Sequence, residues 1–137
     1  MVSYKRQFDY FLKKHGLLPL NHWKFFELEH GKKAIFNENL TKISREVNKR
    51  SGIYIYKKGE RILYIGKAVS LFGRLKSHNR ESFEMVPGDR KDGSYHNFFS
   101  ANNNCGKLNI FWMEIKIEEE RVVFEAMLQH LLKPEFK

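Results

Sequence analysis

Apolar residues recur at helical intervals near the start of the chain. The spacing of Phe8, Phe11 and Leu12 predicts a helix over residues 4–15, and Ser3 stands where its side chain can cap it. We therefore expect the chain to open with an amphipathic helix.

A second helical spacing follows before residue 50. Leu40, Ile43 and Val47 stand three and four residues apart, and either Asn37 or Asn39 can cap the helix that they predict. The first third of the chain is therefore expected to be mainly helical.

The stretch between these two helices has no single pattern. Trp23, Phe26 and Leu28 fit a short helix, whereas residues 33–36 fit an extended segment. Both interpretations stay open for residues 21–36.

Strand-like segments flank a charged turn in the middle of the chain. Aromatic and β-branched residues stand on both sides of a turn that contains Gly59, which predicts a β-hairpin. Tyr54 and Tyr64 share a face of this hairpin only if paired residue numbers sum to an even value. A three-residue loop over residues 58–60 would pair the two tyrosines, and a two-residue loop would separate them. We expect an odd-length turn with Gly59 at positive φ.

A helix and a long loop are predicted after the hairpin. Ser70 can cap a helix that begins at Leu71 and ends near His78, although Gly73 inside it costs about 1 kcal/mol relative to alanine. Either tight packing or a close approach by nucleic acid would favour a glycine there. Residues 85–107 contain proline, glycines and three asparagines, and are expected to form a long loop.

The C-terminal part shows a strand and then a helix. Residues 108–117 alternate, with one face mostly apolar, and residues 118–132 begin with three glutamates that favour a helix N-terminus. The whole pattern predicts an α/β (α+β) fold with a small, mostly antiparallel sheet of three strands flanked by helices. Residues 1–50 are expected to be a basic helical extension, and residues 51–137 the main domain.

Composition and charge narrow the class of protein. The 137 residues suit one domain, and 20 Phe, Tyr and Trp residues supply its core (12 Phe, 6 Tyr, 2 Trp). Residues 1–50 hold 11 Lys and Arg against 5 Asp and Glu, a net charge of +6, and residues 51–84 hold 7 against 3, a net +4. Residues 85–137 hold 7 against 8, a net −1. Such a basic surface attracts nucleic acid, although a soluble basic protein has the same charge.

Other compositional features point to the cytoplasm. No stretch reaches the roughly 20 apolar residues needed to span a bilayer, and the first residues lack the apolar core of a signal peptide. The single cysteine, Cys105, agrees with a reducing compartment. Neither zinc-ligand spacing nor a glycine-rich phosphate loop is present, which argues against a zinc site and a nucleotide hydrolase.

Two triplets carry the clearest functional signal. Gly52-Ile53-Tyr54 and Tyr64-Ile65-Gly66 stand ten residues apart, Lys67 follows directly, and Arg74 comes eight residues after Gly66. Several independent spacings agree at once, so the pattern is specific. The chain resembles the GIY-YIG nuclease family over roughly residues 51–137, and this resemblance implies a divalent-metal-dependent endonuclease that acts on DNA.

Two helical residues are candidates for chemistry on a phosphate. Arg74 and His78 stand four apart and stack on one helix face, where a guanidinium can bind a phosphoryl group and favour the charge of the transition state. His78 can relay a proton near neutral pH, or it is a surface histidine. Lys67 adds a phosphate contact or lowers the pKa of a nearby tyrosine, and Gly66 belongs to the same substrate-binding segment.

The resemblance assigns roles to the two tyrosines. It implies that Tyr54, with His78, removes the proton of the attacking water, and that Tyr64 orients the reacting group. A tyrosine of ordinary pKa, about 10, is a poor base at neutral pH, so a nearby cation must lower that pKa. The alternative is that both tyrosines are ordinary strand aromatics.

Glu125 is the candidate metal ligand. It is the only charged residue among residues 122–128, and a carboxylate suits Mg²⁺ or Mn²⁺. The resemblance implies that Glu125 holds the single catalytic metal, whereas the local pattern alone favours a glutamate that faces water. Family members often carry an asparagine after the lysine-proline pair, but Glu135 follows Lys133-Pro134 here, so no asparagine role is carried over. A non-cleaving nucleic-acid-binding module and a protein-docking adaptor are the alternative functions.

Overall fold

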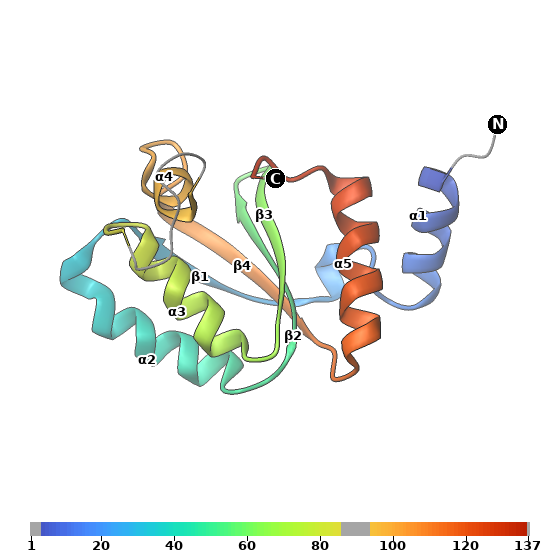
Figure 1. The fold of residues 1–137 in the computed structure, drawn as a ribbon, viewed down its shortest axis with the longest axis horizontal. Helices are drawn as coiled ribbons and strands as arrows, with labels where there is room; N and C mark the ends of the chain where they lie inside the picture. Colours follow the sequence, from blue (N-terminus) through green and yellow to red (C-terminus); the bar gives the residue numbers. More distant parts are fainter. Residues whose placement is uncertain (1–3, 86–93, 137) are drawn as a thin grey trace.

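The computed structural model describes residues 4–85 and 94–136, and the described chain holds one sheet with helices on both faces (Figure 1). The strands are β1 (Lys24–His30), β2 (Gly52–Lys58), β3 (Arg61–Ala68) and β4 (Gly106–Glu114). The helices are α1 (Tyr4–Lys14), α2 (Phe36–Val47), α3 (Leu71–Glu81), α4 (Tyr95–Ser100) and α5 (Glu118–Leu132), with 3₁₀ turns η1 (Leu20–His22) and η2 (Lys33–Ile35).

The sheet has the order β1-β4-β2-β3, and every pair of neighbouring strands is antiparallel. The predicted α/β class with an antiparallel sheet is confirmed. The predicted number of strands is one too small, because β1 joins the sheet through seven residue pairs with β4. Residues from both predicted segments of the chain, 1–50 and 51–137, therefore contribute to the same sheet.

The ambiguous stretch resolves in favour of neither predicted form. Phe26, Leu28 and His30 are buried at alternate positions, so residues 24–30 form a strand and not a helix. Residues 33–35 form a 3₁₀ turn, and Phe36 starts α2, so the extended interpretation of residues 33–36 is wrong. The aromatic residues at positions 23, 25 and 26 fit both the helical period and the strand period, so their spacing does not distinguish a helix from a strand.

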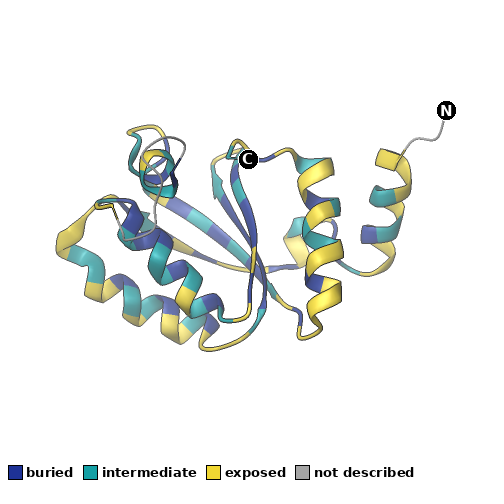
Figure 2. Ribbon diagram, in the orientation of Figure 1, coloured by how far each residue is buried: buried dark blue, intermediate teal, exposed yellow. Residues whose placement is uncertain are grey.

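Two layers of helices enclose the sheet. One buried cluster joins the sheet to α2, α3 and α4, and the other joins the opposite face to α1 and α5 (Figure 1). Strand residues are consequently buried on both faces, whereas the outward faces of the helices are exposed (Figure 2). Burial on both sides explains why residues 52–56 are uniformly buried and not alternating.

The helices predicted from local spacing agree closely with the structure. Helix α1 ends one residue before the predicted limit, and α5 has the predicted bounds. Helix α3 starts at Leu71, and the Ser70 side chain accepts a hydrogen bond from the Gly73 N–H at 3.2 Å, as a cap does.

Two predictions about helix ends and loops need correction. Neither Asn37 nor Asn39 caps α2, because Asn39 is buried and donates instead to the Glu29 carbonyl at 2.8 Å. The predicted loop over residues 85–107 contains helix α4 and the start of β4. Residues 86–93 of that loop, and the predicted cap Ser3, lie outside the described residues.

Around Tyr54 the paired residue numbers of the hairpin sum to an even value, as predicted, but the turn differs from the predicted one. Its loop has two residues, Gly59 and Glu60, so the predicted odd-length turn is wrong, although Gly59 has the predicted positive φ of 61°. A β-bulge then shifts the register between Lys57 and Tyr56, which leaves Leu63 as the extra residue of β3. Beyond the bulge, paired numbers sum to an even value.

No helix among the described residues is long and apolar enough to cross a membrane.

Candidate active site

Tyr54 and Tyr64 lie on the same face of the β2–β3 hairpin. The bulge pairs Tyr54 with Gly66 and Tyr56 with Tyr64, so the predicted direct pairing of Tyr54 with Tyr64 is wrong. The two rings are nevertheless neighbours, with centroids 5.8 Å apart. The structure thus brings both tyrosines of the triplets together.

Gly66 makes room for the two rings. A Cβ added at this position would lie 2.5 Å from the Oη and Cζ atoms of Tyr54 and 2.8 Å from Cε2 of Tyr64. Any other residue would therefore displace the rings, because carbon contacts below 3 Å are repulsive. The second triplet needs its glycine for packing, whether or not the substrate also approaches here.

His78 lies on α3 directly beneath these rings. Its Nε2 atom is 2.7 Å from the Tyr54 hydroxyl, and its Nδ1 atom is 2.9 Å from a carboxylate oxygen of Glu81. His78 and Tyr54 are both fully buried, so His78 is not a surface histidine. Burial, together with the nearby charge of Arg74, holds the pKa of His78 well below its ordinary value, and the imidazole is neutral.

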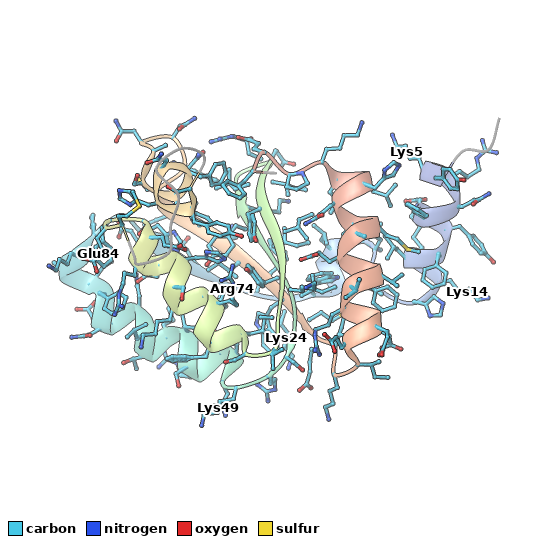
Figure 3. All side chains as sticks on the ribbon, in the orientation of Figure 1. Lys5, Lys14, Lys24, Lys49, Arg74 and Glu84 are labelled. Carbon is cyan, nitrogen blue, oxygen red and sulfur yellow. The ribbon has the colours of Figure 1, made fainter. Side chains whose placement is uncertain are left out.

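Arg74 lies one helical turn before His78, between α3 and the sheet (Figure 3). Its guanidinium carbon is 5.5 Å from the ring centroid of Tyr95, and its charge acts on Tyr54 and Tyr64. Arg74 is only partly buried. The structure therefore places a cation, open to solvent, beside both tyrosines.

The pKa of Tyr54 is raised, whereas a catalytic base at neutral pH needs a lowered pKa. Burial raises it well above the ordinary value, and the charge of Arg74 only partly opposes this effect. Lys67 is not among the groups that act on Tyr54 or Tyr64, so the predicted lowering of a tyrosine pKa by Lys67 is not seen. At neutral pH the Tyr54 hydroxyl is protonated, and it shares a hydrogen bond with Nε2 of the neutral His78.

Tyr95 was missed by sequence reasoning. Its hydroxyl is 3.0 Å from the Tyr64 hydroxyl, and its ring packs between Arg74 and Phe136. It falls in the stretch predicted as a loop, and no sequence motif distinguishes it from the other tyrosines.

Lys67 and Glu125 meet beside the outer edge of β3. Burial raises the pKa of Glu125, and the charge of Lys67 and the backbone N–H of Lys67 oppose this. One turn further along α5, Gln129 donates to the Ile65 carbonyl at 3.1 Å. Helix α5 therefore covers the free edge of β3, and Glu125 is partly buried rather than simply facing water.

An open cavity of about 360 Å³ lies between the β3–α3 segment and α5. Lys67, Arg74 and Gly73 line it from the β3–α3 side, and Glu118 and Arg121 line it from α5. Arg121 is buried and donates to the carbonyls of Ile115 and Lys116 at 2.9 and 3.0 Å, so it also fixes the start of α5.

A single protein carboxylate is enough for magnesium chemistry on a phosphate. Mg²⁺ commonly uses one or two protein carboxylates and completes its octahedron with substrate phosphate and water. Among the described residues, no three His, Cys, Asp or Glu side chains gather closely enough to hold a metal by themselves. Glu118 is the carboxylate that lines the cavity, and Glu125 stands two helical turns further along α5, beside Lys67.

Comparison with known proteins gives a partial relationship. The chain is 32% identical over 95 residues to the UvrABC system protein C of Fervidobacterium nodosum, an alignment that covers 69% of this chain and 14% of that protein. It is 27% identical over 99 residues to the UvrABC system protein C of Aliarcobacter butzleri, which covers 72% of this chain and 15% of that protein. The chain thus matches about one seventh of the length of these relatives. No protein-family model matches it, and no solved structure matches it significantly.

Proposed function

We propose that this protein is a divalent-metal-dependent endonuclease that hydrolyses phosphodiester bonds, most readily in DNA. The observation that carries this proposal is the assembly of Tyr54, Tyr64, Arg74 and His78 into one cluster beside an open, cationic cavity. The similarity to UvrABC system protein C and the resemblance to GIY-YIG nucleases support it.

Arg74 and Lys67 bind the scissile phosphate in this proposal. Both side chains line the cavity, and the Arg74 guanidinium is already held against the Tyr95 ring. A planar guanidinium can make two parallel hydrogen bonds to a phosphoryl group and stabilises the extra negative charge of the transition state. No protein packing at Gly73 requires a glycine. Its role in this proposal is therefore to let the phosphate approach the backbone of α3.

Tyr54 and His78 move the proton of the attacking water together. A free tyrosinate is not the base, because burial raises the Tyr54 pKa. The Tyr54 oxygen instead accepts the proton of water while its own proton passes to Nε2 of His78, 2.7 Å away. Since Tyr54 is fully buried, the side chains around it must shift on DNA binding before water reaches it.

Glu125 holds Mg²⁺ or Mn²⁺ in the same proposal. When bound, such an ion neutralises charge on the phosphate and on the leaving oxygen. Tyr64, whose hydroxyl bonds that of Tyr95, orients the reacting group.

Cleavage of supercoiled plasmid and of branched DNA with Mg²⁺ or Mn²⁺ tests the proposal. Arg74→Ala and Glu125→Ala are expected to lower the cleavage rate by about 10²-fold or more. Matched controls are Arg80→Ala, a partly exposed arginine near the end of α3 that pairs with Glu84, and Glu119→Ala, in the exposed first turn of α5. Both controls are expected to cut like the wild type.

Binding without cleavage would support the second candidate, a nucleic-acid-binding module with the same fold. The full burial of Tyr54 and His78 is the observation that favours it. If the wild type binds DNA in a salt-dependent manner but cuts no substrate with either metal, the nuclease proposal fails.

A further inference from the structure

We propose that Glu81 is a positioning residue, which holds His78 in the tautomer with its proton on Nδ1 so that Nε2 can accept the proton of Tyr54. This inference extends the proposed function, in which Tyr54 and His78 move a proton together. Neither the triplets nor their spacing draws attention to Glu81.

The three side chains form a continuous hydrogen-bonded chain. The Tyr54 hydroxyl is 2.7 Å from Nε2 of His78, and Nδ1 of the same ring is 2.9 Å from Oε1 of Glu81. His78 and Glu81 stand three residues apart on α3, which places them on neighbouring turns of one face. Both ring nitrogens are therefore engaged, each by a group of different chemistry.

The position of Glu81 is costly for a carboxylate. Its side chain is 5% exposed, and burying a charged group is unfavourable unless it is well hydrogen-bonded. Glu81 is also the last residue of α3, and the negative end of a helix disfavours a carboxylate. The hydrogen bond with Nδ1 of His78 offsets part of these costs, and it gives the histidine an acceptor for Nδ1–H.

The chemistry of the partners decides the tautomer. When Glu81 is ionised, its carboxylate only accepts hydrogen bonds, so the ring nitrogen that faces it must carry the proton. The imidazole is neutral because burial and the charge of Arg74 lower its pKa, so Nε2 keeps a free electron pair. The Tyr54 hydroxyl then donates to Nε2.

Other polar and aromatic groups also face His78. The rings of Tyr56, Tyr64, Tyr95 and Phe99 lie within 5.7 Å of its ring centroid, and the nearby Arg74 and His30 both lower its pKa. None of the hydroxyls among them competes for Nδ1 in the described structure, where Glu81 is the partner at that atom.

The proton balance of the step is complete. The water oxygen forms a bond to phosphorus, and the bond from phosphorus to the leaving oxygen breaks with its electron pair. The water proton passes to the Tyr54 oxygen, the Tyr54 proton passes to His78 Nε2, and the leaving oxygen takes a proton from solvent. The imidazolium formed in this way faces the carboxylate of Glu81, which stabilises it.

Ring nitrogen NMR of His78 in the free protein tests the proposal without any need for activity. In the wild type we expect a protonated Nδ1 and an unprotonated Nε2. In Glu81→Gln, whose amide can also donate, and in Glu81→Leu, which cannot accept, we expect the Nε2–H form to become populated. A wild-type ring with its proton on Nε2, or an unchanged tautomer in both variants, overturns the proposal.

Single-turnover cleavage provides the second measurement. Glu81→Gln is expected to lower the rate at saturating DNA by about 10²-fold with little change in DNA affinity, and to shift the pH profile. The matched control is Glu84→Gln, an exposed glutamate beyond the end of α3 (Figure 3), which is expected to leave the rate within about twofold.

A double substitution separates positioning from unrelated structural effects. In a His78→Phe background, Glu81→Gln is expected to cause no further loss, because Glu81 acts through His78. Additive losses overturn the proposal. If the wild type cuts no DNA, the proposed function fails, and the NMR result alone decides whether Glu81 sets the tautomer.

Discussion

Gly66 matters because two tyrosine rings occupy the space where its side chain would be. We expect Gly66→Ala to lower the free energy of unfolding by about 1–3 kcal/mol, since a Cβ would lie 2.5 Å from Tyr54. Urea denaturation followed by circular dichroism measures this change. The same variant should lose cleavage at temperatures where it is still folded, because the rings shift.

Gly73 is the matched control for that substitution. A Cβ there would meet only the Ser70 side chain, at an ordinary 3.5 Å, so Gly73→Ala is expected to raise the unfolding free energy by about 0.5–1 kcal/mol through helix propensity. Equal destabilisation by both substitutions would contradict the steric explanation for Gly66.

His30 gives the protein a specific sensitivity to acid. It is buried, neither ring nitrogen has a hydrogen-bond partner among residues 4–85 and 94–136, and burial lowers its pKa to about 3. Between pH 6.5 and 3 the unfolded chain therefore binds a proton at His30 that the folded chain does not, and stability falls as the pH falls. We expect this histidine to contribute about 1.4 kcal/mol per pH unit in that window.

Replacement of His30 by phenylalanine should remove this contribution. The unfolding free energy of His30→Phe, measured from pH 7 to pH 4, is expected to fall less steeply than that of the wild type. At pH 7 the variant should be at least as stable, because the two unpaired ring nitrogens of His30 are then removed. Parallel curves for the two proteins would show that His30 does not stay neutral in the folded state.

Residues that act through distant contacts were the ones that sequence reasoning missed. Arg74 and His78 were predicted correctly as neighbours, because their proximity follows from helical spacing alone. Glu81 and Tyr95 were not, because their importance arises only when α3 and α4 pack against the hairpin. Local spacing carries no information about that packing.

Helices and strands show the same difference between features with a local sequence signal and features that depend on distant contacts. Helices α1, α3 and α5 were predicted well, because their apolar spacing and caps are local signals. Strand β1 was not, because its identity depends on pairing with β4, about 80 residues further along the chain by the register of the two strands. The bulge at Leu63 was missed as well, because no turn residue or local spacing in the sequence signals it.

Ser70 controls the helix that carries the proposed catalytic residues. We expect Ser70→Ala to lower the unfolding free energy by about 1 kcal/mol, because the first turn of α3 loses its cap. Ser70→Asp should retain the stability, since aspartate caps helices equally well. Thermal or urea denaturation measures both effects.

The aspartate variant also separates stability from binding. Ser70 lines the cavity with Lys67 and Arg74, so a carboxylate there should repel phosphate. We expect Ser70→Asp to bind DNA more weakly than Ser70→Ala, with the difference shrinking at high salt. Equal affinities would show that phosphate does not enter this cavity.

At the scale of the whole molecule, residues 1–50 are integrated with the rest of the fold. They supply β1, which pairs with β4, and helix α2, which contributes Ile43 and Val47 to the core. We therefore expect a protein that starts at residue 51 to be unfolded or aggregated, as judged by circular dichroism and size-exclusion chromatography.

A shorter truncation provides the comparison. Helix α1 packs mainly on α5 and contributes one fully buried residue, Leu12, so a protein that starts at Leu17 should fold with a lower denaturation midpoint. A stable, monomeric protein that starts at residue 51 would show that β1 and α2 are dispensable to the sheet.

The bulge at Leu63 has a consequence for how related sequences are recognised. A two-residue loop and one extra strand residue together place Tyr54 and Tyr64 on the same face. A three-residue loop without the bulge would do the same, so insertions and deletions can compensate within one hairpin. The distance between two triplets along the chain then does not determine which face their tyrosines share. A motif search that lets this distance vary by one residue has a physical justification, whereas one that demands a fixed parity would discard sequences that build the same pair of rings.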